Sequence, residues 1–301
     1  MKITNNPISK LKELTLSSYP VKEIKSVFEI FGVIGMIKIT LNEGESIIRA
    51  RPNENEPFNK ISELSYKLEK YNTSYQRAST PNTTMFYGCV VPDIILDGEP
   101  DNARVTAMFE VSKLLSRGMQ EGEEKLTFSH WKVTKRISLV AIVYHKDFVN
   151  KSSHTKKLYN AHQEYLRSNP NYIDDSIIVT EFLASEFAKT EIKYDHDYLI
   201  SALFTEKVLS MGDAGVYYPS VRANGEGFNV AIAPHFVENN MEPVFVGEHT
   251  LYKKDNYNVL DNDTICELNT ERADFTFRPI EPWLHKGREE CYKILNTEKK
   301  I

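Results

Sequence analysis

The sequence predicts an α+β protein in which a mixed β core is flanked by helices. Short apolar runs bounded by turn residues, such as 85–91, indicate strands. Apolar residues three or four positions apart, as in 103–115, indicate helices. We expect three regions: an N-terminal helical extension at 1–40, a core domain at 41–245 with an insertion at about 150–194, and a C-terminal extension at 246–301.

The N-terminal extension is predicted to be helical because it contains two helix starts. Asn6 and Pro7 form a cap and first-turn pair, and Pro20 opens a second helix with apolar residues spaced through to Phe31. From Ile37 the pattern changes to alternation, which indicates the first strand of the core.

A short apolar strand at 46–50 has an arginine near its end, Arg49, and a second arginine follows at position 51. From Pro52 to Pro81 the chain is polar, which predicts a long loop region interrupted by a short helix at about 61–68. Long loops beside the end of a strand often carry functional residues.

The helix at 103–115 has one acidic residue on its apolar face, Glu110. Asp101 or Asn102 is expected to cap this helix. The stripe that contains Glu110 also holds Ala103, Ala107, Val111 and Leu114. A carboxylate that points toward a protein interior needs a partner or a function.

The second half of the chain is predicted to return to the sheet and to end in a charged helix. Ser220 is expected at the end of a strand, beside a hairpin-like turn. In order, we expect a strand at 137–144, a polar and partly helical region at 150–194, a helix at 195–209, strands at 216–220 and 228–233, and short strands at 249–252 and 273–277.

Composition argues against several classes of partner. The chain has 301 residues, with 42 acidic and 37 basic side chains and a net charge of -5, so no overall positive field attracts nucleic acid or an anionic membrane. The most apolar window, 27–37, is far shorter than the roughly 20 residues that cross a bilayer. We therefore expect neither nucleic acid nor membrane as a partner.

Cysteine and histidine spacing predicts neither a metal site nor a disulfide framework. Cys89, Cys266 and Cys291 are odd in number and lack C-x-x-C spacing, and the histidines form no H-E-x-x-H motif. The first residues also lack the pattern of a secretory signal. A cytoplasmic location fits these observations best.

Distant segments carry residue types that suit the binding and cleavage of a dinucleotide. Arginine grips phosphate through paired hydrogen bonds, tyrosine offers a flat face to an aromatic ring, and glutamate stabilises the sugar cation that forms as a glycosidic bond breaks. This combination suggests NAD, bound as the substrate and not as a separate cofactor. The residues expected at the site are Arg49, Arg51, Arg77, Tyr87, Glu110 and Ser220.

Each of these residues has an expected task. Glu110 is expected to bind the ribose hydroxyls and stabilise the developing positive charge, while Arg49 and Arg77 hold the phosphates. Tyr87 is expected to pack on the nicotinamide or its ribose. Ser220 is expected to orient the same groups and not to act as a nucleophile, because it lacks a G-x-S-x-G elbow. Any one of these residues alone is more often structural, so the prediction depends on their ordered combination.

These motifs resemble the RES domain, a family named for an Arg, a Glu and a Ser in that order. The opening strand of the family looks like Ile47–Arg49, its Phe-Tyr-Gly-like strand like Phe86–Gly88, and its serine-bearing strand like Gly215–Ser220. The resemblance covers roughly half of the chain. Register favours Arg49 over Arg51 as the family arginine.

RES proteins are similar in fold to ADP-ribosyltransferases, and characterised members degrade NAD, often as the toxin of a bacterial toxin-antitoxin pair. The resemblance therefore implies an ADP-ribosyltransferase-like core, cleavage of the nicotinamide-ribose bond with water or phosphate as the acceptor, and a protein antitoxin as a partner. One departure is the loop at Arg77–Ser79, which lacks the aromatic-Asn pair that often follows this arginine.

Two other functions stay open on the same residues. The protein could transfer ADP-ribose to a protein or nucleic acid, with 150–194 as the acceptor surface, or it could bind a nucleotide without turnover. The sequence also leaves the oligomeric state open, a homo-oligomer included.

Overall fold

The computed structural model describes residues 7–31, 34–53, 56–81, 83–92, 103–116, 118–143, 145–169 and 173–297. Within these residues, ten strands form one sheet in the order β1-β5-β6-β7-β3-β2-β4-β8-β9-β10. Neighbouring strands are antiparallel except for β5 and β6, which are parallel. The predicted α+β class is therefore confirmed, and the ADP-ribosyltransferase-like arrangement stays a prediction.

The strands are β1 (Lys38–Leu41), β2 (Ser46–Pro52), β3 (Phe86–Val90), β4 (Glu121–Val133), β5 (Ile137–Ala141), β6 (Gly215–Pro219), β7 (Phe228–Ile232), β8 (Met241–Lys254), β9 (Tyr257–Glu267) and β10 (Arg278–Pro279). The helices are α1 (Pro7–Glu13), α2 (Val21–Ile30), α3 (Ile61–Leu64), α4 (Ala103–Val111), α5 (Lys113–Ser116), α6 (Ser153–Ser168), α7 (Ile173–Phe187), α8 (Leu199–Ser210), α9 (Pro234–Asn240) and α10 (Gly287–Thr297). The proposed cap residues Asn6, Asp101 and Asn102 lie outside the described residues.

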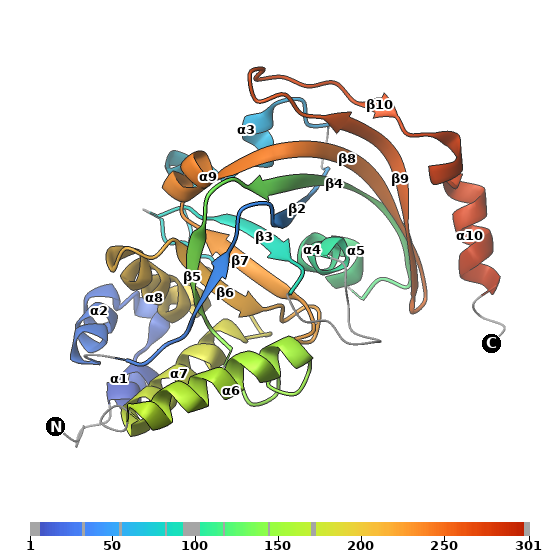
Figure 1. Cartoon of the computed structure of the whole chain (residues 1–301). Helices are drawn as coiled ribbons and strands as arrows, with labels where there is room; N and C mark the ends of the chain where they lie inside the picture. The colour runs from blue at the N-terminus through green and yellow to red at the C-terminus, as the bar shows by residue number, and fades with distance from the viewer. Residues whose placement is uncertain are drawn as a thin grey trace.

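The sheet has two halves that meet between β3 and β2. We call β1, β5, β6, β7 and β3 the first half-sheet, and β2, β4, β8, β9 and β10 the second half-sheet. Figure 1 shows the long strands of the second half-sheet arching over α4 and α5, while α1, α2, α6, α7 and α8 gather beside the first half-sheet. The continuous sheet crosses the expected boundary at 245–246, because β8 begins before it and ends after it.

The long strands of the second half-sheet were largely missed from sequence. β4 spans 13 residues and begins with the sequence Glu-Gly-Glu-Glu-Lys, which disfavours a strand. The burial pattern explains the difference, because residues along this segment alternate between exposed and half-buried positions. β4 then pairs with β8 along its whole length, so long-range pairing overrides the local preference.

Two other sequence predictions need correction in this region. The short strand expected at 249–252 is part of the 14-residue β8. The prediction of a strand at 273–277 is wrong. Within the described residues, this segment contributes only an isolated bridge at Asp274, and the strand β10 begins after it.

The helix predicted at 103–115 is divided into α4 and α5 at Ser112. The Ser112 hydroxyl donates to Glu124 Oε2 over 2.5 Å and accepts from the Leu115 backbone N–H over 3.1 Å. Glu124 also accepts from the backbone N–H groups of Lys113 and Leu114, at 3.0 and 3.1 Å. These bonds satisfy the free amide groups that begin a new helix, which explains the break.

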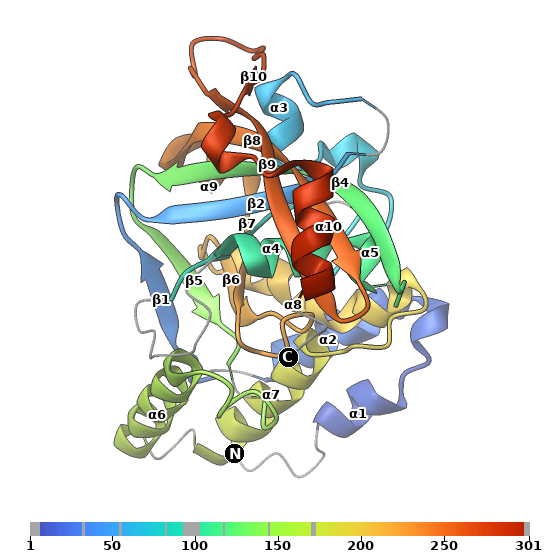
Figure 2. The same ribbon diagram turned by 90° about the vertical axis from the view of Figure 1, so that its right-hand side faces the viewer.

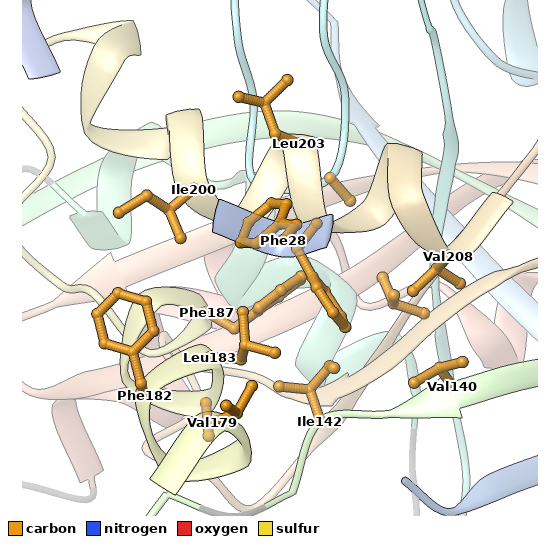
Figure 3. Packing of buried hydrophobic residues seen from close by; sticks show 14 of the residues in the cluster. Phe28, Val140, Ile142, Val179, Phe182, Leu183, Phe187, Ile200, Leu203 and Val208 are labelled. Atoms are coloured by element: carbon orange, nitrogen blue, oxygen red, sulfur yellow. The ribbon is translucent and has the colours of Figure 1, made fainter. Parts of the chain in front are cut away.

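The helices beside the first half-sheet enclose the largest apolar cluster. Figure 3 shows Phe28 of α2 surrounded by residues of α7, α8 and β5, among them Leu183 and Leu203. The segment expected as an insertion supplies α6 and α7, and Phe187 at the end of α7 is 2 % exposed within this cluster. The helices of this segment therefore help to complete the core.

The C-terminal helix covers the outer side of the second half-sheet. Figure 2 shows α10 lying against β8 and β9. Cys291 and Leu295 of α10 are fully buried against Tyr252 of β8. Among the described residues, no helix combines the length and apolar character needed to cross a bilayer.

Replacing Phe28 with alanine tests the helical packing. Phe28 is 5 % exposed, so Phe28→Ala leaves a cavity and should lower the free energy of unfolding by about 3–5 kcal/mol. Ile30→Ala on the same helix is the control, because Ile30 is 53 % exposed and its loss should change stability far less. Urea unfolding followed by circular dichroism measures both, and equal effects would contradict the packing described here.

The second half-sheet contains a buried histidine, His249 of β8, and its burial leads us to predict that stability depends on pH. Burial, and secondarily the Arg104 charge, lower the pKa of His249 to about 4. The unfolded chain takes up a proton near pH 6.5, so stability present above this pH is lost as the pH falls toward 4, by about 3 kcal/mol from this group. The difference between wild type and His249→Gln in urea unfolding at several pH values measures it. Parallel pH profiles would contradict the assignment.

Candidate active site

A cavity of about 190 Å³ opens where the two half-sheets part. Among the described residues, β2 and β3 pair only at Ile48 and Cys89. β2 instead follows β4 along all seven of its residues, and β3 follows β7 along all five. The residues that line the opening include Arg49, Tyr87, Cys89, Glu110, Tyr218 and Asn229, which come from β2, β3, α4, β6 and β7.

Glu110 accepts two hydrogen bonds at the same carboxylate oxygen. The Ser220 hydroxyl donates to Glu110 Oε1 over 2.6 Å, and the Asn229 amide donates to the same oxygen over 2.7 Å. No hydrogen bond from any described residue reaches Oε2, and the side chain is half-buried at the cavity. The carboxylate is therefore fixed in position and keeps one oxygen for a ligand hydroxyl.

Ser220 is held through both its backbone and its side chain. It is fully buried, its backbone N–H donates to Gly227 over 2.6 Å, and its hydroxyl accepts from the backbone N–H of Ala223 over 3.0 Å. Because that hydroxyl also donates to Glu110, both of its roles are occupied. This geometry suits positioning and not nucleophilic attack.

Asn229 is oriented by a thiol behind it. Burial, and secondarily the nearby Glu110 charge, raise the pKa of Cys89, so the group remains a thiol at neutral pH. Its S–H donates to Asn229 Oδ1 over 3.1 Å. With the oxygen taken by the thiol, the amide nitrogen faces Glu110.

Arg49 provides a positive charge at the same opening. Its Nη1 donates to the backbone oxygen of Tyr87 over 2.7 Å, across the gap between β2 and β3, and its guanidinium lies 5.3 Å from the centre of the Phe86 ring. Burial, and then the neighbouring Arg51, lower the pKa of Arg49 to about 10, so it stays charged at neutral pH. Its Nε is buried without a hydrogen-bond partner in the described part of the chain, which leaves a donor for an anion.

Tyr87 lines the cavity and also contacts the loop at 78–79 through its hydroxyl. Its hydroxyl accepts from the Ala78 backbone N–H over 3.1 Å and lies 2.8 Å from the Ser79 hydroxyl. Burial raises the pKa of Tyr87 to about 12, so the phenol stays protonated. The hydroxyl therefore fastens the 78–79 loop, while the residue lines the cavity.

The other two arginines predicted for the site, Arg51 and Arg77, do not line this small cavity. Arg51 lines a larger cavity of about 1000 Å³, which also includes Arg49 and Tyr87 in its lining. The Arg77 guanidinium donates to the backbone oxygens of Phe187 and Lys189 and stacks on Tyr198, 5.3 Å from its ring centre. Arg77 is not among the described residues that line either cavity. The structure therefore gathers Arg49, Tyr87, Glu110 and Ser220 at one site, sets Arg51 beside it, and gives Arg77 contacts with backbone.

Two functional candidates were absent from the sequence prediction, Asn229 and Cys89. Asn229 was visible as one polar residue in an otherwise apolar buried strand, and a buried amide requires partners. Cys89 gave no such signal, because a thiol in a buried strand is ordinary.

Two glycines allow the close approaches on which the site depends. A Cβ on Gly88 would lie 2.5 Å from Ile47 Cγ2, where β3 meets β2. A Cβ on Gly227 would lie 2.1 Å from Thr106 Oγ1 of α4, one turn before Glu110. The loop that carries Ser220 can therefore contact α4 only because residue 227 has no side chain.

Compared with known proteins, the chain matches no protein-family model and no curated sequence.

Replacing Gly227 tests this contact. Gly227→Ala should push the 220–227 loop from α4, lower the free energy of unfolding by about 1–3 kcal/mol, and lengthen the Ser220–Glu110 contact. Gly122→Ala is the control, because its Cβ would meet only the flexible end of Leu114. Urea unfolding measures the energies, and a crystal structure of the variant measures the contact. An unchanged contact with unchanged stability would contradict the argument.

Proposed function

We propose that this protein is an NAD-consuming enzyme that cleaves the bond between nicotinamide and ribose. The observation that carries the proposal is the Glu110 carboxylate, held by Ser220 and Asn229 in a cavity that also contains the Arg49 guanidinium. Cleavage of a glycosidic bond requires a fixed negative charge beside the sugar, and a dinucleotide requires a cation for its phosphates. In this proposal the core is ADP-ribosyltransferase-like and the chain is a RES-type protein.

Glu110 has the central chemical role. Its free oxygen Oε2 accepts a hydrogen bond from a ribose hydroxyl, and its charge stabilises the cation-like sugar as the C–N bond breaks. The bonding electron pair leaves with the pyridinium ring, which becomes neutral nicotinamide. The acceptor then adds to the sugar carbon, and its proton passes to solvent. Ser220 and Asn229 hold the carboxylate at the position where charge develops.

In this proposal, each of the two cavities holds one end of the dinucleotide. A volume of about 190 Å³ is below the roughly 300–1000 Å³ of typical small-molecule pockets, so the small cavity takes the nicotinamide riboside end. The adjoining cavity of about 1000 Å³ takes the adenosine end. Arg49 belongs to both linings and Arg51 to the larger one, which suits the pyrophosphate between the two ends.

Arg77 receives a different task in this proposal from the phosphate contact expected from sequence. Its contacts to the backbone at Phe187 and Lys189 hold the loop that contains Ala78 and Ser79. Those two residues in turn fix the hydroxyl of Tyr87. Arg77 is thus a positioning residue for the cavity wall.

Water or phosphate is the proposed acceptor. The segment at 150–194, considered as an acceptor surface for macromolecules, packs Leu166, Leu183 and Phe187 into the protein interior. These buried contacts favour a structural role for the segment.

A toxin function with a protein antitoxin is proposed from the resemblance of the motifs alone.

The Glu110→Gln variant tests the proposal directly. Wild-type protein incubated with NAD should release nicotinamide, and Glu110→Gln should slow this roughly 100- to 1000-fold, because the amide lacks the charge that stabilises the sugar cation. Glu191→Gln, at an exposed position after α7, is the control and should retain full activity. Chromatography of the products measures nicotinamide.

The acceptor is identified in the same assay. Reactions with and without phosphate separate hydrolysis from phosphorolysis, and adenine-labelled NAD separates both from transfer to a macromolecule. Binding of NAD without any product would support a non-catalytic module. Unchanged NAD under every condition, or full activity of Glu110→Gln, contradicts the proposed function.

A further inference from the structure

The larger cavity is basic in a chain that is acidic overall. Among the described residues that line it, five are basic and two are acidic, whereas the whole chain carries a net charge of -5. The five are Arg49, Arg51, Lys60, Lys67 and Arg272, and the two are Glu238 and Glu271. A concave surface lined mainly by one sign of charge concentrates ligands of the opposite sign.

Three of the basic residues lie apart from the arginines of β2. We call Lys60, Lys67 and Arg272 the basic wall. Lys60 and Lys67 flank α3, and Arg272 belongs to the loop between β9 and β10, which passes beside α3 in Figure 1 and Figure 2. All three are exposed, and none forms an ion pair with another described residue.

Backbone hydrogen bonds hold the two parts of the basic wall together. The Ile61 N–H donates to the Ala273 oxygen over 2.9 Å, and the Phe275 N–H donates to the Asn59 oxygen over 2.8 Å. Lys60 also forms an isolated bridge with Asp274. The loop that carries Arg272 is thus fastened to the start of α3, so its charge is placed on the same side of the cavity as Lys60.

Glu238 and Glu271 offset two of the five positive charges, which leaves the described lining with a net charge of +3. Glu238 also accepts a hydrogen bond from the Tyr66 hydroxyl. Arg49 and Arg51, alternate residues of β2, already match the two charges of a pyrophosphate. The basic wall therefore supplies positive charge beyond what NAD itself requires.

We propose that the basic wall binds a phosphomonoester, and that the preferred substrate is an NAD-type dinucleotide with an additional phosphate on its adenosine end, as in NADP. This inference rests on the proposed function and names its substrate class. A phosphomonoester carries about -1.5 to -2 charges at neutral pH and three acceptor oxygens, which suits three cations. Tyr66, Tyr71 and Trp131 in the same lining provide aromatic surface for the adenine.

The same chemistry has a second source, a separate phosphate ion. The position of the cavity favours the dinucleotide, because Arg49 and Tyr87 line both this cavity and the one that contains Glu110. A phosphate attached to the adenosine end is then carried to the basic wall by the rest of the molecule. A free ion has no such advantage of effective concentration.

The test compares NADP and NAD in three proteins. Wild type should cleave NADP with a kcat/KM at least about tenfold above that for NAD, the size expected from one added charge-assisted contact. The triple variant Lys60→Gln, Lys67→Gln, Arg272→Gln should reduce this ratio to about one. The control Lys156→Gln, Lys157→Gln, Arg167→Gln removes the same charge from exposed positions of α6 and should keep the ratio.

Each outcome decides between the two proposals. Cleavage of NAD with no preference for NADP, or a preference that survives in the triple variant, overturns the basic wall and leaves the proposed function intact. Inorganic phosphate that binds wild type but not the triple variant in calorimetry, without an NADP preference, assigns the basic wall to a free ion and also overturns this inference. Failure to cleave either dinucleotide removes the proposed function itself. Lys67→Gln alone should lower the ratio in part, and it serves if the triple variant does not fold.

Discussion

The parting of β2 and β3 is the constraint on which the rest of the site depends. A sheet that stayed paired along both strands would bury the backbone of Tyr87 and leave no space beside Glu110. Here each strand follows its other neighbour, and among the described residues the ladder pairing between β2 and β3 is reduced to Ile48 and Cys89. The Arg49 side chain bonds to the Tyr87 backbone oxygen that faces the gap. One residue thus satisfies the exposed backbone and keeps a charge at the opening.

α4 connects the two halves through side chains. At its start, Arg104 donates to Asn262 of β9 over 3.1 Å and lies 3.1 Å from His249 Nδ1 of β8, which belong to the second half-sheet. At its end, Glu110 accepts hydrogen bonds from Asn229 of β7, in the first half-sheet, and from Ser220 in the turn that follows β6. The apolar residues between these ends fill the concave side of the arch. The position of the carboxylate is therefore determined by elements far apart in sequence.

Sequence patterns predicted the parts of this arrangement that depend on local spacing. Helical periodicity predicted Glu110 on the inward face of a helix, and turn residues predicted Ser220 at the end of a strand. The structure places both residues in this way. The length of β4 and β9 could not be predicted, because their charged and polar residues form strands only through pairing with β8. The contacts of Arg77 were equally hidden, since they involve backbone oxygens more than 100 positions away. Asn229 shows the limit most clearly, because its orientation comes from the Cys89 thiol on another strand.

Because α4 is attached at both ends, His249 of β8 and Asn262 of β9 help to position Glu110, although neither residue lines the two cavities proposed to hold the substrate. A substitution that removes the contacts of Arg104 with β8 and β9 would allow α4 to rotate or shift. The Glu110 carboxylate would then move with the helix. Under the proposed function, this displacement would lower activity while most of the core stayed folded. The proposed function therefore depends on two separate places, the opening at Glu110 and the distant contacts of Arg104 with β8 and β9.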